Sequence, residues 1–273
     1  MRIVKTAALA ALVLFFTSLM PGMSHAADGT SYVAMGDSFA SGAGAGSYYP
    51  DTASKKGDGC YRSQNAYGPL LGTELGADLD FRACSGARIP DIYADQVDAL
   101  DDSTGLVTLS VGGNDIGFAD VLSTCTFNGT STCEARVDEA ERQATEDLPS
   151  ELDALYAEVR QSAPNADVLI VGYPVLFVEQ TCWGNLGINT TEQKFINDAT
   201  YVLRDVVAAA AGRAGFSFAD PIDEFDGRGV CASGSYVNGL KSDLAESYHP
   251  NATGHADGFM PELRSAVAAV AAS

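Results

Sequence analysis

Two short apolar runs constrain the fold of this 273-residue chain more than any other feature. Leu106–Val111 and Val168–Val171, the latter within the strand candidate Val168–Tyr173, are apolar enough to be central strands that are buried on both faces. Shorter β-like runs are expected at Tyr32–Met35, Leu79–Ala83 and Phe216–Ala219. Strands buried on both faces belong to parallel sheets, because the crossover connections between parallel strands cover the sheet with helices.

Helical stretches separate these runs, as a parallel sheet requires. We predict a single-domain α/β protein, a three-layer α/β/α sandwich with a parallel, flavodoxin-like sheet of about five strands. No internal repeat, heptad array or long linker indicates a second domain. The helical candidates are Asn65–Leu75, Asp91–Leu100, Cys133–Gln161 with a break at Pro149, Thr190–Arg213, and Thr253–Ala271 with an interruption near Pro261.

The first 26 residues have the features of a secretory signal peptide rather than of folded structure. Arg2 and Lys5 precede the uncharged apolar run Thr6–Leu19, and Ser24-His25-Ala26 supplies small residues at alternate positions. The apolar run is short for a membrane span. We therefore expect cleavage after Ala26 and a secreted domain comprising residues 27–273.

The charge of the chain argues against a polyanionic partner. The formal net charge is −20, and removal of a leader with two basic and no acidic residues leaves 14 basic against 36 acidic residues, or −22. Such a charge repels phosphate backbones, so we expect no nucleic-acid partner and at most transient contact with lipid surfaces. A high negative charge also keeps an exported protein soluble, and we expect a monomer.

Six cysteines remain after the leader, an even number that favours disulfides in an exported protein. Spacing alone leaves their pairing open. Zinc is the alternative ligand, but the sequence has no C-x-x-C pair and only two histidines beyond the leader. We expect neither a metal nor an organic cofactor.

Polar, glycine-bearing turns follow the first three predicted strands. They contain Gly36-Asp37-Ser38, Ser85-Gly86 and Gly112-Gly113-Asn114-Asp115. The carboxyl ends of parallel strands lie at one edge of a sheet, where sites of such proteins form. A serine on a sharp turn after a strand can act as a nucleophile, so Ser38 is the candidate nucleophile.

The general base follows by elimination. Only His249 and His255 remain once the leader is removed. His249 precedes Pro250, which holds it in an extended conformation at a helix entry, and we select it as the base. His255 falls one turn into that helix and is expected to pack or to face solvent.

Three groups are candidates for an oxyanion hole, in which each donor lowers the barrier by about 3 kcal/mol. They are the backbone N–H of Ser38, the backbone N–H of Gly86 and the side-chain amide of Asn114. Ordinary turn chemistry explains such residues singly. Their appearance after successive strands favours a site.

Four motifs occur in order along the chain: Gly36-Asp37-Ser38, Gly86, Gly112-Gly113-Asn114-Asp115 and His249-Pro250. In this order they resemble the motifs of the SGNH (GDSL-type) hydrolases, especially the secreted actinobacterial lipases, esterases and phospholipases. The resemblance spans nearly the whole mature chain. It implies the SGNH-hydrolase fold, Ser38 as nucleophile, His249 as base, and Ser38, Gly86 and Asn114 as the oxyanion hole. It also implies three sequential disulfides, Cys60–Cys84, Cys125–Cys133 and Cys182–Cys231.

One position departs from the family pattern. Many members have Asp three residues before the histidine, where this chain has Glu246. The longer side chain is less suited to reach the imidazole from the same backbone position. We expect the main-chain carbonyl of Ser247 to orient His249, with the Glu246 carboxylate as second choice.

The resulting functional prediction is a secreted serine esterase or lipase that hydrolyses fatty-acyl esters, including triacylglycerols and phospholipids, through an acyl-enzyme on Ser38. Its partner would be a small-molecule or lipid ester. The segments Tyr48-Tyr49-Pro50 and Val175-Leu176-Phe177, together with Trp183, are candidates to line an acyl groove or simply to pack. The alternatives are a carbohydrate O-acetyl esterase on the same fold, a glycosidase with paired carboxylates, and a non-catalytic secreted binding protein.

Overall fold

The computed structural model describes residues 29–53, 57–185 and 187–271. The predicted signal peptide, residues 1–26, lies outside the described residues. Within the part that is described, no helix is both long and apolar enough to cross a membrane.

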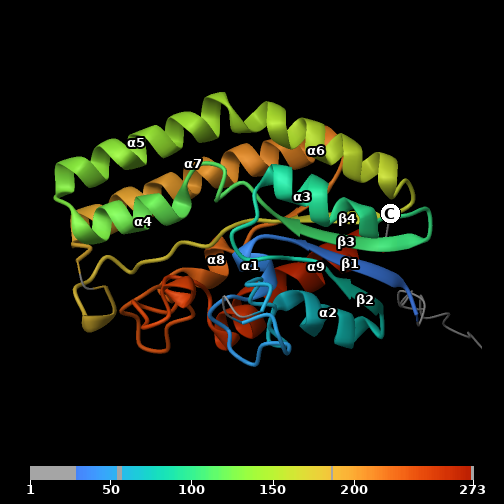
Figure 1. The fold of residues 1–273 in the computed structure, drawn as a ribbon, viewed down its shortest axis with the longest axis horizontal. Coiled ribbons are helices and arrows are strands. Elements are labelled where there is room, and N and C mark those ends of the chain that lie inside the picture. Colours follow the sequence, from blue (N-terminus) through green and yellow to red (C-terminus); the bar gives the residue numbers. More distant parts are fainter. Residues whose placement is uncertain (1–28, 54–56, 186, 272–273) are drawn as a thin grey trace, which may run out of the picture.

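The predicted parallel sheet is confirmed. Its strands, in the spatial order β2-β1-β3-β4-β5, all run parallel (Figure 1). The order reverses at β1, so β1 and β3 form the topological switch point at which α/β proteins bind ligands. The strands are β1 (Ser31–Gly36), β2 (Asp78–Phe81), β3 (Thr104–Ser110), β4 (Asp167–Val171) and β5 (Ser217–Ala219).

Helices cover both faces of the sheet, which confirms the three-layer sandwich (Figure 1). One face is covered by α2 (Tyr67–Leu75) and α9 (Met260–Val270). The other face carries α3 (Ile89–Asp95), α6 (Leu148–Ser162) and α7 (Thr190–Ala214), with α4 (Phe118–Phe127) and α5 (Thr130–Glu146) extending that layer to one end of the molecule. The short helices are α1 (Ser38–Ser41) and α8 (Ile222–Phe225).

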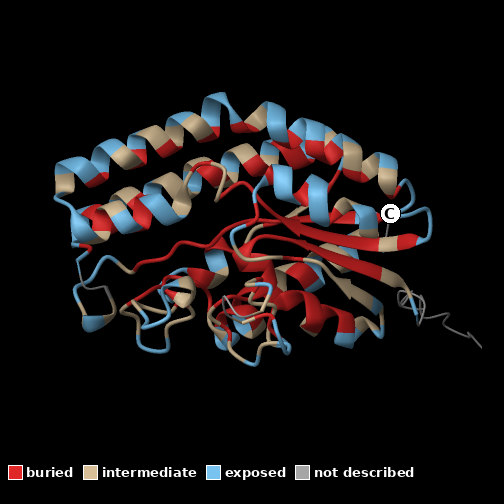
Figure 2. Ribbon diagram, in the orientation of Figure 1, coloured by how far each residue is buried: buried red, intermediate tan, exposed pale blue. Residues whose placement is uncertain are grey.

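Strands β1, β3 and β4 are almost entirely buried, whereas the edge strands β2 and β5 are mostly half-buried, and the exposed residues of the outer helices lie mainly on their outer faces (Figure 2). Burial on both faces explains the continuous apolar run Val168–Val171 of β4 and the buried Leu106, Val107 and Leu109 of β3. Helix α6 buries Leu152, Leu155 and Val159 at helical spacing and contacts α3, α5 and α7. The apolar residues whose spacing predicted the strands and helices therefore pack together in one hydrophobic core.

The helix interruptions predicted at Pro149 and near Pro261 are both present. Pro149 separates the long acidic stretch into α5 and α6, because it occupies the second position of α6, where its missing N–H costs little. The interruption expected near Pro261 is a wider π-helical turn, Gly254–Phe259, that leads into α9. Pro261 is the second residue of α9, where its lack of an N–H costs little.

The described residues contain the disulfides Cys60–Cys84, Cys125–Cys133 and Cys182–Cys231. These are the pairs that the family resemblance implies. The first joins the turn after β2 to the segment before α2, the second joins α4 to α5, and the third joins two loops between β4 and α9.

Candidate active site

Ser38 and His249 meet at the carboxyl edge of the sheet. Ser38 is the first residue of α1, directly after β1, and His249 lies in the loop that precedes the last helical segment. The Nε2 atom of His249 lies 2.7 Å from Oγ of Ser38, and both residues are buried. Residues 211 positions apart in the sequence therefore form a direct hydrogen bond.

The main chain orients the His249 ring. Nδ1 lies 2.9 Å from the carbonyl oxygen of Ser247. A carbonyl oxygen only accepts, so Nδ1 carries the proton and Nε2 is free to accept from the Ser38 hydroxyl. Burial among apolar groups, including the ring of Phe39 at 5.0 Å, lowers the pKa of His249 to about 4, although the bond to Ser247 opposes that shift. The imidazole is therefore neutral and able to accept a proton at neutral pH.

The Glu246 side chain does not contact His249. Its Oε1 accepts a hydrogen bond from the hydroxyl of Tyr48 at 2.8 Å, and the same hydroxyl accepts from the backbone N–H of Gly44 at 2.9 Å. Of the two orienting groups considered from the sequence, the structure thus brings the Ser247 carbonyl to the imidazole and directs the Glu246 carboxylate to Tyr48.

Asn238 connects the histidine loop to the glycine-rich loop, a role that the sequence did not indicate. Its backbone N–H donates to the carbonyl of His249 at 2.9 Å, and its Nδ2 donates to the carbonyl of Gly44 at 2.9 Å. Gly44 has φ +91, and a Cβ added there would lie 2.6 Å from Nδ2 of Asn238 and 3.1 Å from Cβ of His249. A side chain at position 44 would collide with this network.

Hydrogen bonds from two distant residues fix the turn that carries Ser38. The Gln96 side chain bonds both backbone groups of Gly36, at 2.7 and 3.0 Å. Asp37 accepts from the backbone N–H of Phe39 at 2.9 Å and from the Tyr173 hydroxyl at 2.6 Å. Burial raises the pKa of the Asp37 carboxyl to about 7, against the lowering effect of these two bonds.

Tyr173 also joins this turn to the turn after β3. Its hydroxyl accepts from the backbone N–H of Gly113 at 3.1 Å while it donates to Asp37. The position of Tyr173 at the end of a predicted buried strand was the only sequence signal for it, and nothing in the sequence indicated Gln96.

Gly86 and Asn114 line the same cavity as Ser38 and His249. Gly86 has φ +83, a conformation that favours glycine, although a Cβ there would meet no atom within 4 Å. Nδ2 of Asn114 donates to the carbonyl of Ala87 at 3.0 Å, which leaves its second N–H for a ligand. Asp115, the next residue, accepts a hydrogen bond from the backbone N–H of Ile89 at 3.0 Å. This bond connects the turn after β3, which carries Asn114, to the segment that follows Gly86.

The cavity beside Ser38 has a volume of about 320 Å³ and is lined mainly by apolar side chains. The cavity has two walls, which come from parts of the chain that are far apart in the sequence. Helix α4 forms one wall, and the loop before His249 forms the other. None of its lining comes from Tyr48-Tyr49-Pro50, Val175-Leu176-Phe177 or Trp183. The apolar lining residues are Phe118, Ala119, Leu122, Phe127, Leu240, Leu244, Ala245 and Tyr248.

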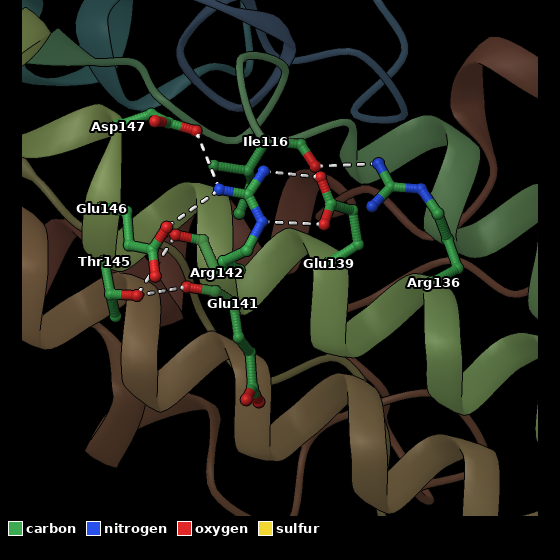
Figure 3. A network of polar contacts seen from close by, with 8 residues as sticks. All are labelled: Ile116, Arg136, Glu139, Glu141, Arg142, Thr145, Glu146 and Asp147. Atoms are coloured by element: carbon green, nitrogen blue, oxygen red, sulfur yellow. Dashed lines mark hydrogen bonds and ion pairs between the residues drawn. The ribbon is translucent and has the colours of Figure 1, made fainter.

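Arg136 on α5 supports the wall formed by α4. Its Nη2 donates to the carbonyl of Ile116 at 2.9 Å and to that of Gly117 at 3.2 Å, and its Nε bonds Asp120 at 2.6 Å. Figure 3 shows the guanidinium turned toward Ile116, beside the neighbouring network in which Arg142 pairs with Glu139, Glu146 and Asp147. The long outer helix thus holds the segment between the Asn114 turn and the cavity.

His255 is packed in the core and takes no part in this site. Its Nδ1 accepts from the backbone N–H of Tyr67 at 3.2 Å, and burial lowers its pKa to about 3. Within residues 29–53, 57–185 and 187–271, no group of three or more His, Cys, Asp or Glu residues is arranged to hold a metal ion.

Comparison with known proteins places this geometry in context. Residues 34–256 match the model of the GDSL-like lipase/acylhydrolase family. The chain is 40% identical to Lipase 1 of Streptomyces coelicolor over 245 residues, which cover 88% of this chain and 87% of that protein. Its structure resembles an extracellular lipase from Streptomyces rimosus (TM-score 0.81) and phospholipase A1 from Streptomyces albidoflavus NA297 (TM-score 0.82). Each is 37% identical to it, and each comparison covers 87% of this chain and 99% of the other.

Proposed function

The chain belongs to the GDSL-like lipase/acylhydrolase family, and from that premise we propose that it is a secreted hydrolase of fatty-acyl esters in which Ser38 is the nucleophile and His249 the base. The observation that carries this proposal is the 2.7 Å contact between Nε2 of His249 and Oγ of Ser38 at an apolar cavity. The relatives named above support a carboxylic ester hydrolase, and the disulfides are compatible with export.

The reaction proceeds through an acyl-enzyme. His249 accepts the Ser38 proton as Oγ attacks the ester carbonyl, and the tetrahedral oxyanion is stabilised by the N–H groups of Ser38 and Gly86 and by the Asn114 amide. The C–O bond to the alcohol then breaks, and the imidazolium returns its proton to the leaving oxygen. Water repeats the sequence, releasing the fatty acid and restoring Ser38.

The electrostatics of the site suit this chemistry. A neutral imidazole can accept the proton, and the Ser247 carbonyl then stabilises the Nδ1–H of the imidazolium. The apolar lining favours an acyl chain longer than acetyl, because each buried methylene contributes about 0.8 kcal/mol of transfer free energy. Triacylglycerols and phospholipids therefore fit this cavity better than acetylated sugars, which offer no chain to bury.

The test is a substrate panel with two serine variants. The purified mature protein is assayed on p-nitrophenyl esters of increasing chain length, triacylglycerol, phosphatidylcholine and acetylated xylan. Ser38→Ala should abolish turnover of every substrate and still fold. Ser41→Ala is the matched control, since Ser41 is a buried serine on the same short helix whose hydroxyl donates only to the Ser38 carbonyl, at 3.3 Å.

Two results would contradict the proposal. Full activity of Ser38→Ala would remove the serine from the mechanism. A preference for acetylated xylan over every long-chain ester would make the chain a carbohydrate esterase instead.

A further inference from the structure

The most exposed large apolar side chains in the described part of the chain gather at one place. Trp183, Phe127 and Leu244 are exposed by 86%, 74% and 66%. The other exposed large hydrophobic residues there are tyrosines, none of them more than 42% exposed. Exposure of this extent is unfavourable in water, so three such side chains together indicate a surface that contacts something apolar.

Two of the three line the cavity beside Ser38, and the third, Trp183, lies in a segment that contacts the cavity walls. Phe127 and Leu244 are lining residues of that cavity, on opposite walls. The segment that carries Trp183 contacts both walls. The Gly184 carbonyl accepts from the backbone N–H of the lining residue Leu240 at 2.7 Å, and Gly187 lies against the backbone of Thr126, next to Phe127. Figure 1 shows the end of α4 and these two loops at the same end of the molecule.

Covalent links support the backbone behind these side chains. Cys182, adjacent to Trp183, is bonded to Cys231, and Cys125, two residues before Phe127, is bonded to Cys133. We call Trp183, Phe127 and Leu244 the apolar rim. Disulfides therefore restrain the backbone next to two of its three residues, Trp183 and Phe127.

The charges around the rim indicate which apolar surface it suits. Asp243 and Glu246 flank Leu244 in a segment whose cation is Lys241, Asp120 on α4 is paired with Arg136, and the whole chain carries a net charge of −20. An anionic lipid surface would repel this face, whereas a neutral or zwitterionic surface would not. Tryptophan and phenylalanine are also the side chains that favour the boundary between water and lipid.

We propose that the apolar rim docks the enzyme on the surface of a neutral or zwitterionic lipid aggregate, with the cavity mouth held against the lipid. An acyl chain then passes from the aggregate to Ser38 along Phe127 and Leu244 without crossing water. The inference rests on the proposed ester hydrolysis, and it adds the surface from which the substrate is taken.

The chain supplies its own probe, because Trp183 is its only tryptophan. Full-length mature protein carrying Ser38→Ala is titrated with phosphatidylcholine vesicles, and the inactive site prevents hydrolysis during the measurement. The fluorescence of Trp183 should shift to shorter wavelength and saturate with lipid. Phosphatidylglycerol vesicles at low salt should produce a much smaller shift. No shift with phosphatidylcholine, or an equal response to anionic vesicles, would overturn the proposal.

Vesicle flotation tests the role of the rim directly. Trp183→Ser in the Ser38→Ala background should lower the partition coefficient at least tenfold, because a serine has no apolar surface to insert. The matched control is Tyr201→Ser, which removes an exposed aromatic side chain from α7. An equal loss in both variants, or none in Trp183→Ser, would overturn the assignment.

A third measurement separates this proposal from the proposed function. With Ser38 intact, Trp183→Ser should hydrolyse a monomeric short-chain ester at the normal rate and vesicle phosphatidylcholine at least tenfold more slowly. Loss of both activities would contradict docking, whereas hydrolysis by Ser38→Ala would contradict only the mechanism. Concentration-dependent self-association that buries Trp183 without lipid would make the rim a contact between copies of this chain.

Discussion

Glu246→Gln tests which group orients His249. In the structure the carboxylate accepts a hydrogen bond from Tyr48, and the imidazole Nδ1–H is directed to the Ser247 carbonyl. Glutamine keeps a side-chain oxygen that can accept from Tyr48, so the change removes the charge and leaves the geometry around His249 intact. We therefore expect kcat/KM to change by no more than about threefold.

The expected effect on folding is equally small. A hydrogen bond to a charged group contributes about 1.5–3 kcal/mol, and a neutral one about 1 kcal/mol. Replacing the partly exposed carboxylate by an amide should lower the free energy of unfolding by about 1 kcal/mol. A carboxylate that serves as the third member of a triad behaves differently, since its amide variant loses about 10⁴-fold in kcat.

The assay is kcat/KM on a soluble p-nitrophenyl ester, with thermal unfolding measured on the same samples. Tyr48→Phe is the matched control, because it removes the same hydrogen bond from the other partner. The two single variants and the double variant should differ little in activity. If Glu246→Gln lost three or more orders of magnitude in kcat while folded, and Tyr48→Phe did not, the carboxylate would be the orienting group.

Three further predictions concern other parts of the site. Asn114→Ala should lower kcat by roughly 10²–10³-fold with little change in KM, since its amide acts on the transition state; an equal rise in KM would refute this. The His249 pKa of about 4 predicts that kcat/KM stays level as pH falls from 8 to about 5 and drops tenfold per unit below 4, as the base becomes protonated; a break near 6.5 would contradict it. Replacing Cys60 and Cys84 by alanine should cost about 3 kcal/mol of unfolding free energy, for a separation of 24 residues, and lower kcat by loosening the Gly86 turn; unchanged thermal unfolding would exclude it.

The sheet could be predicted from sequence because its signals are local. Buried parallel strands are apolar on both faces, so each appears as a short run without reference to its neighbours. Helix α4 was not predicted. It follows Gly117, which has φ +78, and has no side-chain cap, so its start lacks the usual signal.

The apolar wall of the cavity could not be assigned from the sequence. Val175-Leu176-Phe177 is apolar and follows a strand, but it is buried, and the Asn197 side chain accepts from the backbone N–H groups of Leu176 and Phe177 at 3.3 and 3.2 Å. Phe118 and Leu122, on the unpredicted α4, face the cavity instead. An apolar residue in a loop does not reveal whether it turns toward the core or toward a ligand, because that depends on elements distant in the sequence.

The order in which the cysteines pair has a consequence for biogenesis. The first of the six cysteines bonds the second, the third bonds the fourth, and the fifth bonds the sixth. The separations are 24, 8 and 49 residues, and no disulfide loop encloses or crosses another. A chain threaded through a membrane from its N-terminus exposes its cysteines one after another. Each second cysteine of a pair would then emerge when only one unpaired thiol, its correct partner, is already outside. Vectorial oxidation of this kind yields the native pairing without a step of disulfide isomerisation.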